Sequence, residues 1–145
     1  MSEQKFPVVE VPGFMSENTK YDTTYRRSIK WDPAAGDFVR DGANRLAECD
    51  GREAFAIWCF KIAQTERYRC LAYQSSVGTE TERAMSSDDE RTVESMLQRT
   101  ITEALMVNPR TEDVRDFVFS HDGDSMHCTF KVNGVNFDEE ITITI

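Results

Sequence analysis

The sequence of 145 residues has few histidines, no closely spaced cysteine pair, no long apolar run and an excess of acidic over basic residues. It has two histidines, and its four cysteines are scattered with no C-x-x-C pair. No window approaches the roughly 18–20 consecutive apolar residues of a transmembrane helix, and the first residues lack the basic-then-apolar order of a signal peptide. Basic residues are outnumbered, 17 against 26 acidic, for a net charge of −9. These absences argue against a membrane protein and, because binding phosphates requires a concentrated basic face, against a nucleic-acid-binding protein.

What is present suffices for one folded domain. Apolar residues make up 39% and aromatic residues 10% of the chain, enough for a core and against wholesale disorder. Cys59 and Cys128 lie on predicted apolar faces, so we expect buried free thiols in a reducing compartment and not disulfide partners or metal ligands. The protein is therefore expected to be made and folded in the cytosol. Its acidity leaves open a partner with a basic surface.

The first part of the chain predicts an arm followed by a hairpin. Residues 1–22 hold two of the four prolines and are expected to form an extended N-terminal arm, ahead of an α+β domain at 23–145. Alternation predicts a strand at 25–31. A Pro- and Gly-containing turn at 32–36 then leads into a returning strand at 37–40.

Two helices are predicted in the middle of the chain. The first spans about 52–65, with a short strand-like piece at 69–73 after it. The second opens with a capping box at Ser87, where a serine is followed three residues later by a glutamate. It ends near residue 107, because Asn108 precedes a proline and is pushed out of the helical region. The apolar stripes that define the two helices are Phe55, Trp58, Cys59 and Ile62 in the first, and Val93, Met96, Leu97, Thr100, Ile101, Ala104 and Leu105 in the second.

The last third alternates as an antiparallel meander. Asp122-Gly-Asp124 predicts a hairpin turn and Asn133-Gly134 a second one, before a final strand at 137–145. On the first strand, Phe117 and Phe119 are expected to share a face with Arg115 and His121, opposite Val114 and Val118. The predicted fold is a single α+β domain with two main helices packed on a mixed β-sheet and a C-terminal antiparallel meander.

Chemistry-bearing residues form no recognisable catalytic cluster. His121 and His127 flank Asp122 and Asp124, so a tight turn offers either a weak metal site or ordinary turn chemistry, and we favour the turn. Paired carboxylates are explained by helix caps and solvated strand faces, and no motif for a nucleophile, phosphate loop or zinc site is present. The sequence therefore predicts a non-enzyme with no catalytic residues, metal or cofactor; the alternative is a lysozyme-like cell-wall glycan hydrolase.

The order of several short motifs resembles a known family. Asp37-Phe-Val-Arg-Asp-Gly42 precedes a helix with Glu53-Ala54-x3-Trp58. Thr65-x-Arg67-Tyr68 and Tyr73-x4-Gly78-x-Glu80 follow, and then Glu103-Ala-Leu-x2-Asn108-Pro109-Arg110-x3-Val114. This succession over about residues 24–132 resembles the small baseplate wedge subunits of contractile-tailed phages, the XkdS-like group within the so-called lysozyme-like wedge or sheath-initiator family.

The resemblance implies a structural part of a contractile tail or related injection machine. Such subunits are virion components of the baseplate, present in multiple copies in a ring and assembled in the host cytoplasm. They bind larger wedge proteins and the tail sheath, with tube-proximal proteins as further partners. The charge and hydropathy described above predict no nucleic-acid or membrane partner. Many relatives carry Glu-Pro-Arg where this chain has Asn-Pro-Arg, so a glutamate-mediated contact is not expected at this position. The wedge-contact residues that the resemblance implies are Asn108, Pro109, Arg110, Arg67, Gly78 and Glu80.

The final strand fits that role in one physical respect. A terminal strand leaves backbone hydrogen-bonding groups exposed unless another chain pairs with it, so a neighbouring subunit can extend the sheet there. The alternatives are that the strand only completes this domain's own sheet, or that the protein is a cytosolic adaptor unrelated to phage. The residues expected to pair with the sheath are Phe137, Ile141, Ile143 and Ile145.

Overall fold

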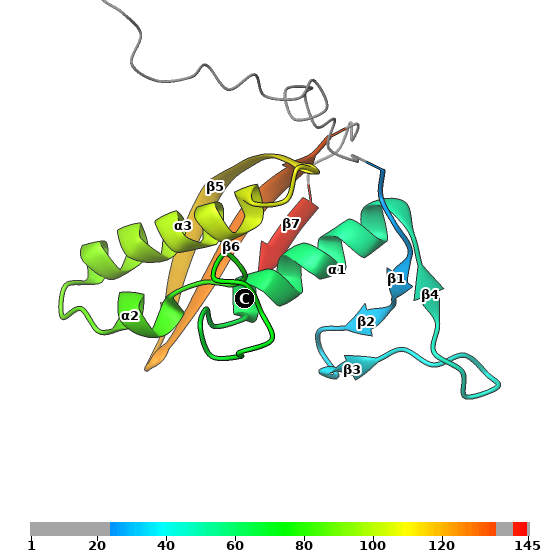
Figure 1. Ribbon diagram of the computed structural model, residues 1–145. Coiled ribbons are helices and arrows are strands. Elements are labelled where there is room, and N and C mark those ends of the chain that lie inside the picture. Colours follow the sequence, from blue (N-terminus) through cyan, green and yellow to red (C-terminus); the bar gives the residue numbers. More distant parts are fainter. Residues whose placement is uncertain (1–23, 136–140, 145) are drawn as a thin grey trace, which may run out of the picture.

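The computed structural model describes residues 24–135 and 141–144. Within these residues the fold is α+β, as predicted, with the helices grouped beside a small antiparallel sheet (Figure 1). The predicted arm at 1–22, Phe137 and Ile145 lie outside the described residues. No described helix is long and apolar enough to cross a membrane. In chain order the elements are β1 (Ser28–Ile29), β2 (Trp31–Asp32), β3 (Asp37–Phe38), β4 (Glu48–Cys49), α1 (Gly51–Gln64), α2 (Thr81–Met85), α3 (Glu90–Met106), β5 (Thr111–Asp122), β6 (Ser125–Gly134) and β7 (Ile141–Thr144).

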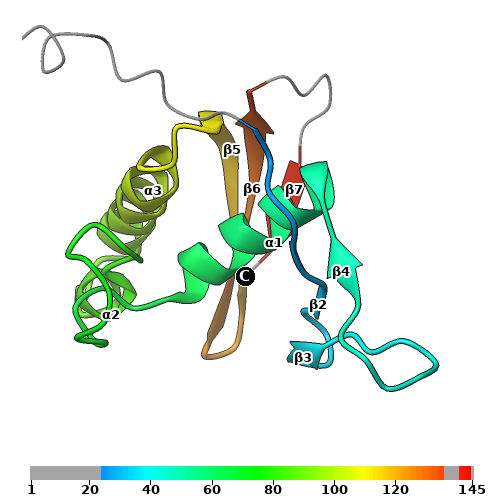
Figure 2. The same cartoon turned by 45° about the vertical axis from the view of Figure 1, so that its right-hand side comes forward.

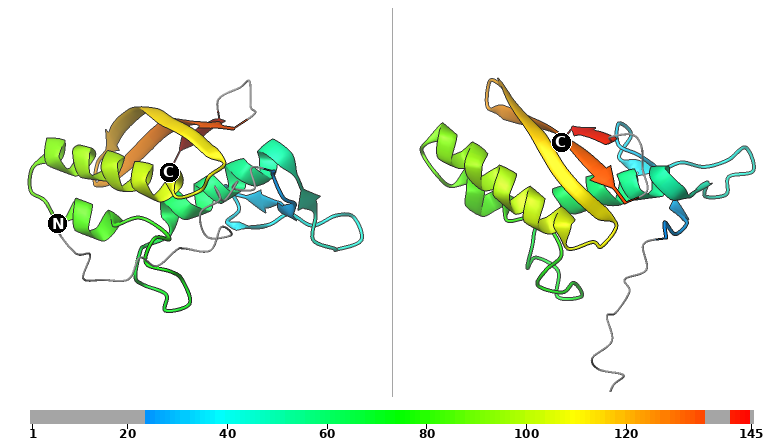
Figure 3. Two further views of the ribbon diagram at one scale, coloured as in Figure 1. Left: turned by 45° about the horizontal axis from the view of Figure 1, so that its top comes forward. Right: turned by 90° about the horizontal axis from the view of Figure 1, so that it is seen from above.

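The main sheet has the order β5-β6-β7, and α1 and α3 cover one of its faces (Figures 2 and 3). Both strand pairs are antiparallel, and so are the pairs β1–β4 and β2–β3, whereas the sequence predicted a mixed sheet. The hairpin between β5 and β6 turns at the predicted place, with Asp122 opposite Ser125 and Gly123 at a φ of 60°. The predicted meander is therefore present in the described strands.

The core lies where the helical stripes meet β6, as their spacing predicts. Its members are Phe55, Cys59 and Ala63 of α1, Ile101 and Leu105 of α3, and Cys128, Phe130 and Val132 of β6.

The predicted burial of Cys59 and Cys128 is also confirmed. All four cysteines are free, and three of them are buried. Burial raises the pKa of Cys128 to about 11 and raises that of Cys59 far above its ordinary value. Both thiols are therefore protonated at neutral pH and act as small apolar side chains.

A bulge in β5 reverses part of the predicted facing. Arg115 pairs with Lys131 but Val118 pairs with Thr129, so Asp116 and Phe117 together oppose a single residue of β6. Asp116 takes a left-handed φ of 55° to make this bulge. Strict alternation placed the side chains of Val114 and Phe117 on opposite faces of the sheet. This is wrong, because the extra residue in the bulge returns both side chains to the core face.

The N-terminal part of the described chain forms short antiparallel strand pairs. The predicted hairpin is present as β2 and β3, with Trp31 opposite Phe38. The Lys61 ammonium of α1 lies 4.6 Å and 4.8 Å from the centres of these two rings, which fixes the hairpin to the helix. The single strand predicted at 25–31 is instead split between β1 and β2. β1 pairs with β4, for which no strand was predicted.

Three local predictions in the middle and end of the chain are wrong. The piece at 69–73 is not a strand, and it is followed by α2, a short helix where no helix was predicted. The second long helix, α3, is capped by Asp89, whose carboxylate accepts from the Thr92 N–H at 3.0 Å, and not by Ser87. Asn133-Gly134 is not a turn but the end of β6, where Gly134 pairs with Thr111. At α3 a competing cap replaces the predicted one, and at Gly134 pairing with β5 replaces the predicted turn.

Candidate functional site

The predicted wedge-contact motif lies in the link between α3 and β5. α3 ends at Met106 with Val107 as its cap, as the proline at 109 requires. The Asn108 side-chain oxygen accepts from the Arg110 backbone N–H at 3.0 Å and from its guanidinium at 3.5 Å. An oxygen at this position therefore shapes the link around Arg110, a task that an amide oxygen can perform in place of a carboxylate oxygen.

Arg110 ties together three segments that are far apart in sequence. Its guanidinium Nε donates to the Thr24 carbonyl, and its own carbonyl accepts from the Val135 N–H at 2.9 Å. The Tyr25 hydroxyl lies between the carbonyls of Arg110 and Val135. Burial is the main cause that raises the pKa of Tyr25, so this hydroxyl stays protonated and can donate. Arg110 thus holds the start of the described chain against the end of β6.

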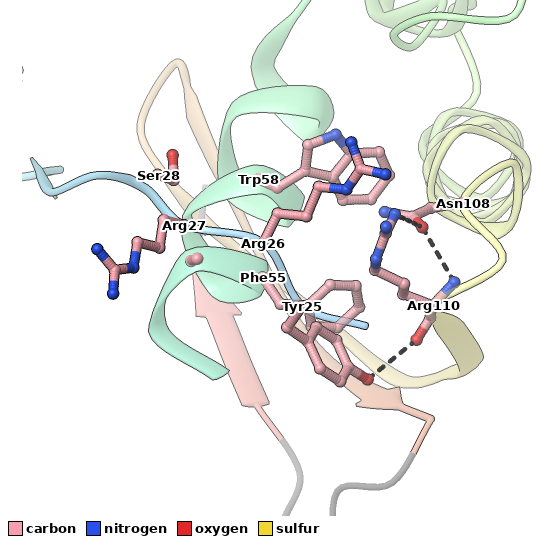
Figure 4. Close-up of a pocket in the computed structure, with 9 residues that line it drawn as sticks. Tyr25, Arg26, Arg27, Ser28, Phe55, Trp58, Asn108 and Arg110 are labelled. Atoms are coloured by element: carbon pink, nitrogen blue, oxygen red, sulfur yellow. Dashed lines mark hydrogen bonds between the residues drawn. The ribbon is translucent and has the colours of Figure 1, made fainter. Parts of the chain in front are cut away.

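A basic groove opens beside this junction (Figure 4). It has a volume of about 230 Å³, and three of its lining residues are arginines although the protein carries a net charge of −9. Figure 4 shows Arg26 and Arg110 extending toward the side of Trp58 and Asn108, whereas Arg27 extends to the opposite side of its segment. We call this cavity the arginine groove; its lining is Tyr25, Arg26, Arg27, Ser28, Ala54, Phe55, Trp58, Asn108 and Arg110.

Aromatic rings form one wall of the arginine groove. The rings of Tyr25 and Phe55 meet edge to face at 5.4 Å, and Phe55 stacks on Trp58 at 6.2 Å. Guanidinium groups bind carboxylates through planar, charge-assisted hydrogen bonds, and aromatic rings accept apolar side chains. The groove therefore has the chemistry to take a protein segment that carries an acidic residue beside an apolar one.

The other predicted contact residues, Arg67, Gly78 and Glu80, surround the base of a single loop. The Arg67 N–H donates to the Thr79 carbonyl at 2.7 Å, and its side-chain Nε donates to the Gly78 carbonyl at 3.0 Å. The Thr79 N–H returns a bond to the Thr65 carbonyl at 2.8 Å. These bonds close the loop at its base, and we call residues 67–78 the clasped loop.

Gly78 is required by this closure. It has a φ of 90°, and a Cβ built there would lie 2.4 Å from the carbonyl oxygen of Thr65. That oxygen belongs to the backbone that makes the clasp, so it cannot move aside without breaking it. Gly78 is buried, and its role within the chain is to let two backbone segments approach.

The base of the clasped loop also fixes α2. The Glu66 carboxylate accepts from the N–H groups of Thr81 and Glu82, at 3.1 Å and 3.4 Å, at the start of that short helix. The Glu80 N–H donates to the Thr100 hydroxyl of α3 at 2.8 Å. Glu80 therefore contributes its backbone to the junction of α2 and α3, with its side chain half-buried.

Sequence reasoning missed the residues that the clasped loop presents to solvent. Leu71 is fully exposed, and Tyr68 and Tyr73 are 66% and 56% exposed. Ordered loops that expose several large apolar side chains are typical of protein contacts. Tyr68 and Tyr73 stand in the motifs quoted above, but the interpretation of residues 69–73 as strand-like gave no reason to place these side chains in solvent.

The largest of the described cavities, about 470 Å³, lies between α1, α2, α3 and β6 and is mainly apolar. Two carboxylates stand at its rim, but both are already engaged. Glu66 accepts the α2 N–H groups, and Glu82 pairs with Arg69 at 3.1 Å. The cavity therefore offers a packing surface, and these two carboxylates have structural roles.

The predicted sheath-pairing residues Ile141 and Ile143 lie in β7. Ile141 pairs with Val132 and Ile143 with Phe130 of β6. In the sheet formed by the described residues, β7 is an outer strand with β6 on one side only. Its other side is the edge that another strand can join.

The four residues of the predicted metal alternative do not converge. His121 pairs with Met126 and His127 with Ser120, and these neighbouring positions of an antiparallel pair face opposite sides of the sheet. His121 lies instead against Glu90 and Glu94 of α3. The turn chemistry that we favoured for Asp122-Gly-Asp124 is the one observed.

Comparison with known proteins agrees with the resemblance found in the sequence. Residues 27–136 match the family model described as contractile injection system sheath initiator. The chain is also 31% identical over 84 residues to the phage-like element PBSX protein XkdS of Bacillus subtilis (strain 168). That match covers 57% of this chain and 60% of the length of XkdS.

Proposed function

The chain belongs to the contractile injection system sheath initiator family, and we propose that it is a non-enzymatic baseplate subunit on which the first ring of tail sheath assembles. In this proposal the protein is part of the virion or injection particle. It sits in multiple copies in the baseplate, is assembled in the host cytoplasm, and contacts larger wedge proteins on one side and sheath on the other.

The edge of β7 that no other described strand covers carries the sheath part of the proposal. A strand with a partner on one side only presents alternate N–H and C=O groups to whatever approaches. A strand from a sheath subunit can add there and satisfy these groups, in a contact of fixed direction and register. Phe137, Ile141, Ile143 and Ile145 remain the residues proposed for this contact.

The wedge part of the proposal rests on the arginine groove and the clasped loop. We assign the direct contact to Arg110 and Pro109 at the groove, with Asn108 shaping the link. At the clasped loop we assign it to Tyr68, Leu71 and Tyr73. Arg67, Gly78 and Glu80 support this surface from behind, since their backbone and side-chain bonds hold the loop closed.

The sheath contact is tested with two neighbouring prolines in β7, T142P and I143P. Successive residues of a strand direct their N–H groups to opposite sides, so one of these prolines removes a bond to β6 and the other removes a donor from the free edge. We expect the edge-facing variant to stay as stable as wild type yet to give baseplates without sheath, seen by electron microscopy.

The β6-facing proline is the matched control, because it lowers the stability of the protein itself. Normal sheathed tails from a folded edge-facing variant would contradict the proposal. A deletion of residues 138–145 gives an independent check, since it removes the strand without adding a proline.

The non-enzymatic role is tested by zymography on peptidoglycan. The lysozyme-like alternative predicts clearing of a cell-wall substrate by the purified protein. We expect no clearing, because the rim carboxylates of the largest described cavity already bind an arginine and the N–H groups of α2. Clearing that is lost in E66Q or E82Q would establish the hydrolase instead.

A further inference from the structure

Three metal-ligating side chains from two elements converge where the first turns of α3 meet β5. Glu90 and Glu94 are one helical turn apart on α3, and His121 stands opposite them on β5. The His121 Nε2 lies 2.6 Å from a Glu90 oxygen and 3.4 Å from a Glu94 oxygen. One donor atom from each residue falls within 4.8 Å of the others.

Apolar packing holds the two elements together around this cluster. Val93 and Leu97, on the buried side of α3, pack with Phe119 and Met126 of the hairpin. Phe119 precedes His121 by two residues, and Met126 is its cross-strand partner. The backbone on both sides of His121 is therefore fixed against the helix that carries the two glutamates.

The charges of the cluster are not balanced by one imidazole. Its Nε2 carries at most one proton and can donate to only one of the two carboxylates at a time. A divalent cation between the three groups would neutralise both carboxylates and take the nitrogen as a ligand.

We propose that Glu90, Glu94 and His121 bind one divalent transition-metal ion of the zinc class, tying α3 to β5. Zinc bonds to nitrogen and carboxylate oxygen are about 2.0–2.2 Å long, so tetrahedral donors lie about 3.3–3.5 Å apart. The separation of His121 and Glu94 already has this value. The Glu90 oxygen, on an exposed side chain, would have to move outward from its 2.6 Å contact with His121 to reach this value. The oxygens of Glu90 and Glu94, which lie within 4.8 Å of one another, would also have to settle at this separation.

The donor set selects the metal class. An imidazole nitrogen with two carboxylates suits zinc and its transition-metal neighbours, whereas calcium and magnesium prefer all-oxygen shells. Three protein ligands leave one position for water, and the partly exposed side chains give the ion access from solvent. The site is independent of the sheath and wedge contacts proposed above.

The test is titration of the full-length chain, stripped by a chelator, with zinc chloride in a calorimeter. A C70S background is used throughout to remove the exposed thiol. We expect one saturable equivalent of zinc, with Kd raised about tenfold or more in H121Q and in E94Q. Magnesium and calcium should bind at least about tenfold more weakly than zinc.

H127Q and D124N are the matched controls from the same hairpin. Both should bind zinc as the parent does, since neither residue belongs to the converging set. Thermal denaturation gives a second readout, in which saturating zinc raises the Tm of the parent but not of E94Q or H121Q. Absence of saturable binding would overturn the proposal, as would loss of binding in the control variants while E94Q and H121Q keep it.

Discussion

The arginine groove and the clasped loop, the two sites that hold the predicted wedge-contact residues, each depend on a hydrogen bond from an arginine. They differ in the surface that this bond supports. In each, an arginine Nε donates to a backbone carbonyl, Thr24 for Arg110 and Gly78 for Arg67. At the groove the bond joins residues 86 positions apart, and the arginine also lines a cavity. At the loop the bond joins residues 11 apart and closes a single loop.

The comparison suggests two roles for a motif residue. It can contact a partner itself, or it can position the neighbouring residues that make the contact. Arg110 lines a groove while it organises the link, so in the proposed function its motif belongs to the contact surface itself. Arg67 and Gly78 serve the loop closure, and the exposed side chains between them are the ones we propose as the contact surface.

The largest effect on stability is expected for Gly78→Ala in the clasped loop. The new Cβ would clash with the Thr65 carbonyl at 2.4 Å in a left-handed backbone, and we expect a loss of about 3 kcal/mol in the free energy of unfolding. Urea denaturation measures it.

Gly123→Ala is the matched control for that substitution. It has a φ of 60° and nothing within 4 Å of the added carbon, so it isolates the backbone strain, about 1 kcal/mol. If Gly78→Ala and Gly123→Ala lower the free energy of unfolding equally, the close approach at residue 78 would contribute nothing to the cost of the substitution.

Paired alanine substitutions separate the two arginines. R67A and R110A each remove a hydrogen bond to a backbone carbonyl, and each should cost about 1 kcal/mol of stability. Hydrogen exchange should then localise the damage differently. R67A should speed exchange at Thr79, whose N–H belongs to the clasp, and R110A at Val135, whose N–H bonds to the Arg110 carbonyl.

A reversed or shared pattern of exchange would contradict the division of roles between the arginines. The backbone N–H groups that report on each site stay unchanged in the variants, so the comparison is direct.

The smallest effect on stability is expected for Leu71→Ser. The side chain is fully exposed, so the free energy of unfolding should change by less than about 0.5 kcal/mol. Association with the co-expressed wedge proteins should nevertheless weaken, as measured by co-purification.

Val118→Ser is the control for that variant, since Val118 is also exposed but lies on β5, away from the clasped loop. If both serine variants weaken association equally, surface hydrophobicity and not the clasped loop would be responsible.

Prediction from sequence succeeded where one short window carried the whole signal. The apolar stripe of α3, its end before Pro109, the Asp122-Gly-Asp124 hairpin and the buried thiols were all anticipated. It failed where the local structure depends on contact with a second segment of the chain. Alternation cannot reveal the bulge at Asp116, and no window around residue 48 announces that β4 will pair with β1. The predicted contact residues were found as motifs, but their separation into groove and loop required the fold.

What the sequence determined by itself is the family, the α+β class, and the helices and turns whose bonds join residues a few positions apart. Only the tertiary structure decided the closure of the loop between Thr65 and Thr79, the junction of Tyr25, Arg110 and Val135, and the meeting of His121 with α3. The physical reason is the range of the interactions. Local spacing fixes neighbours along a helix or hairpin, whereas these contacts exist only after packing of the core brings distant segments together.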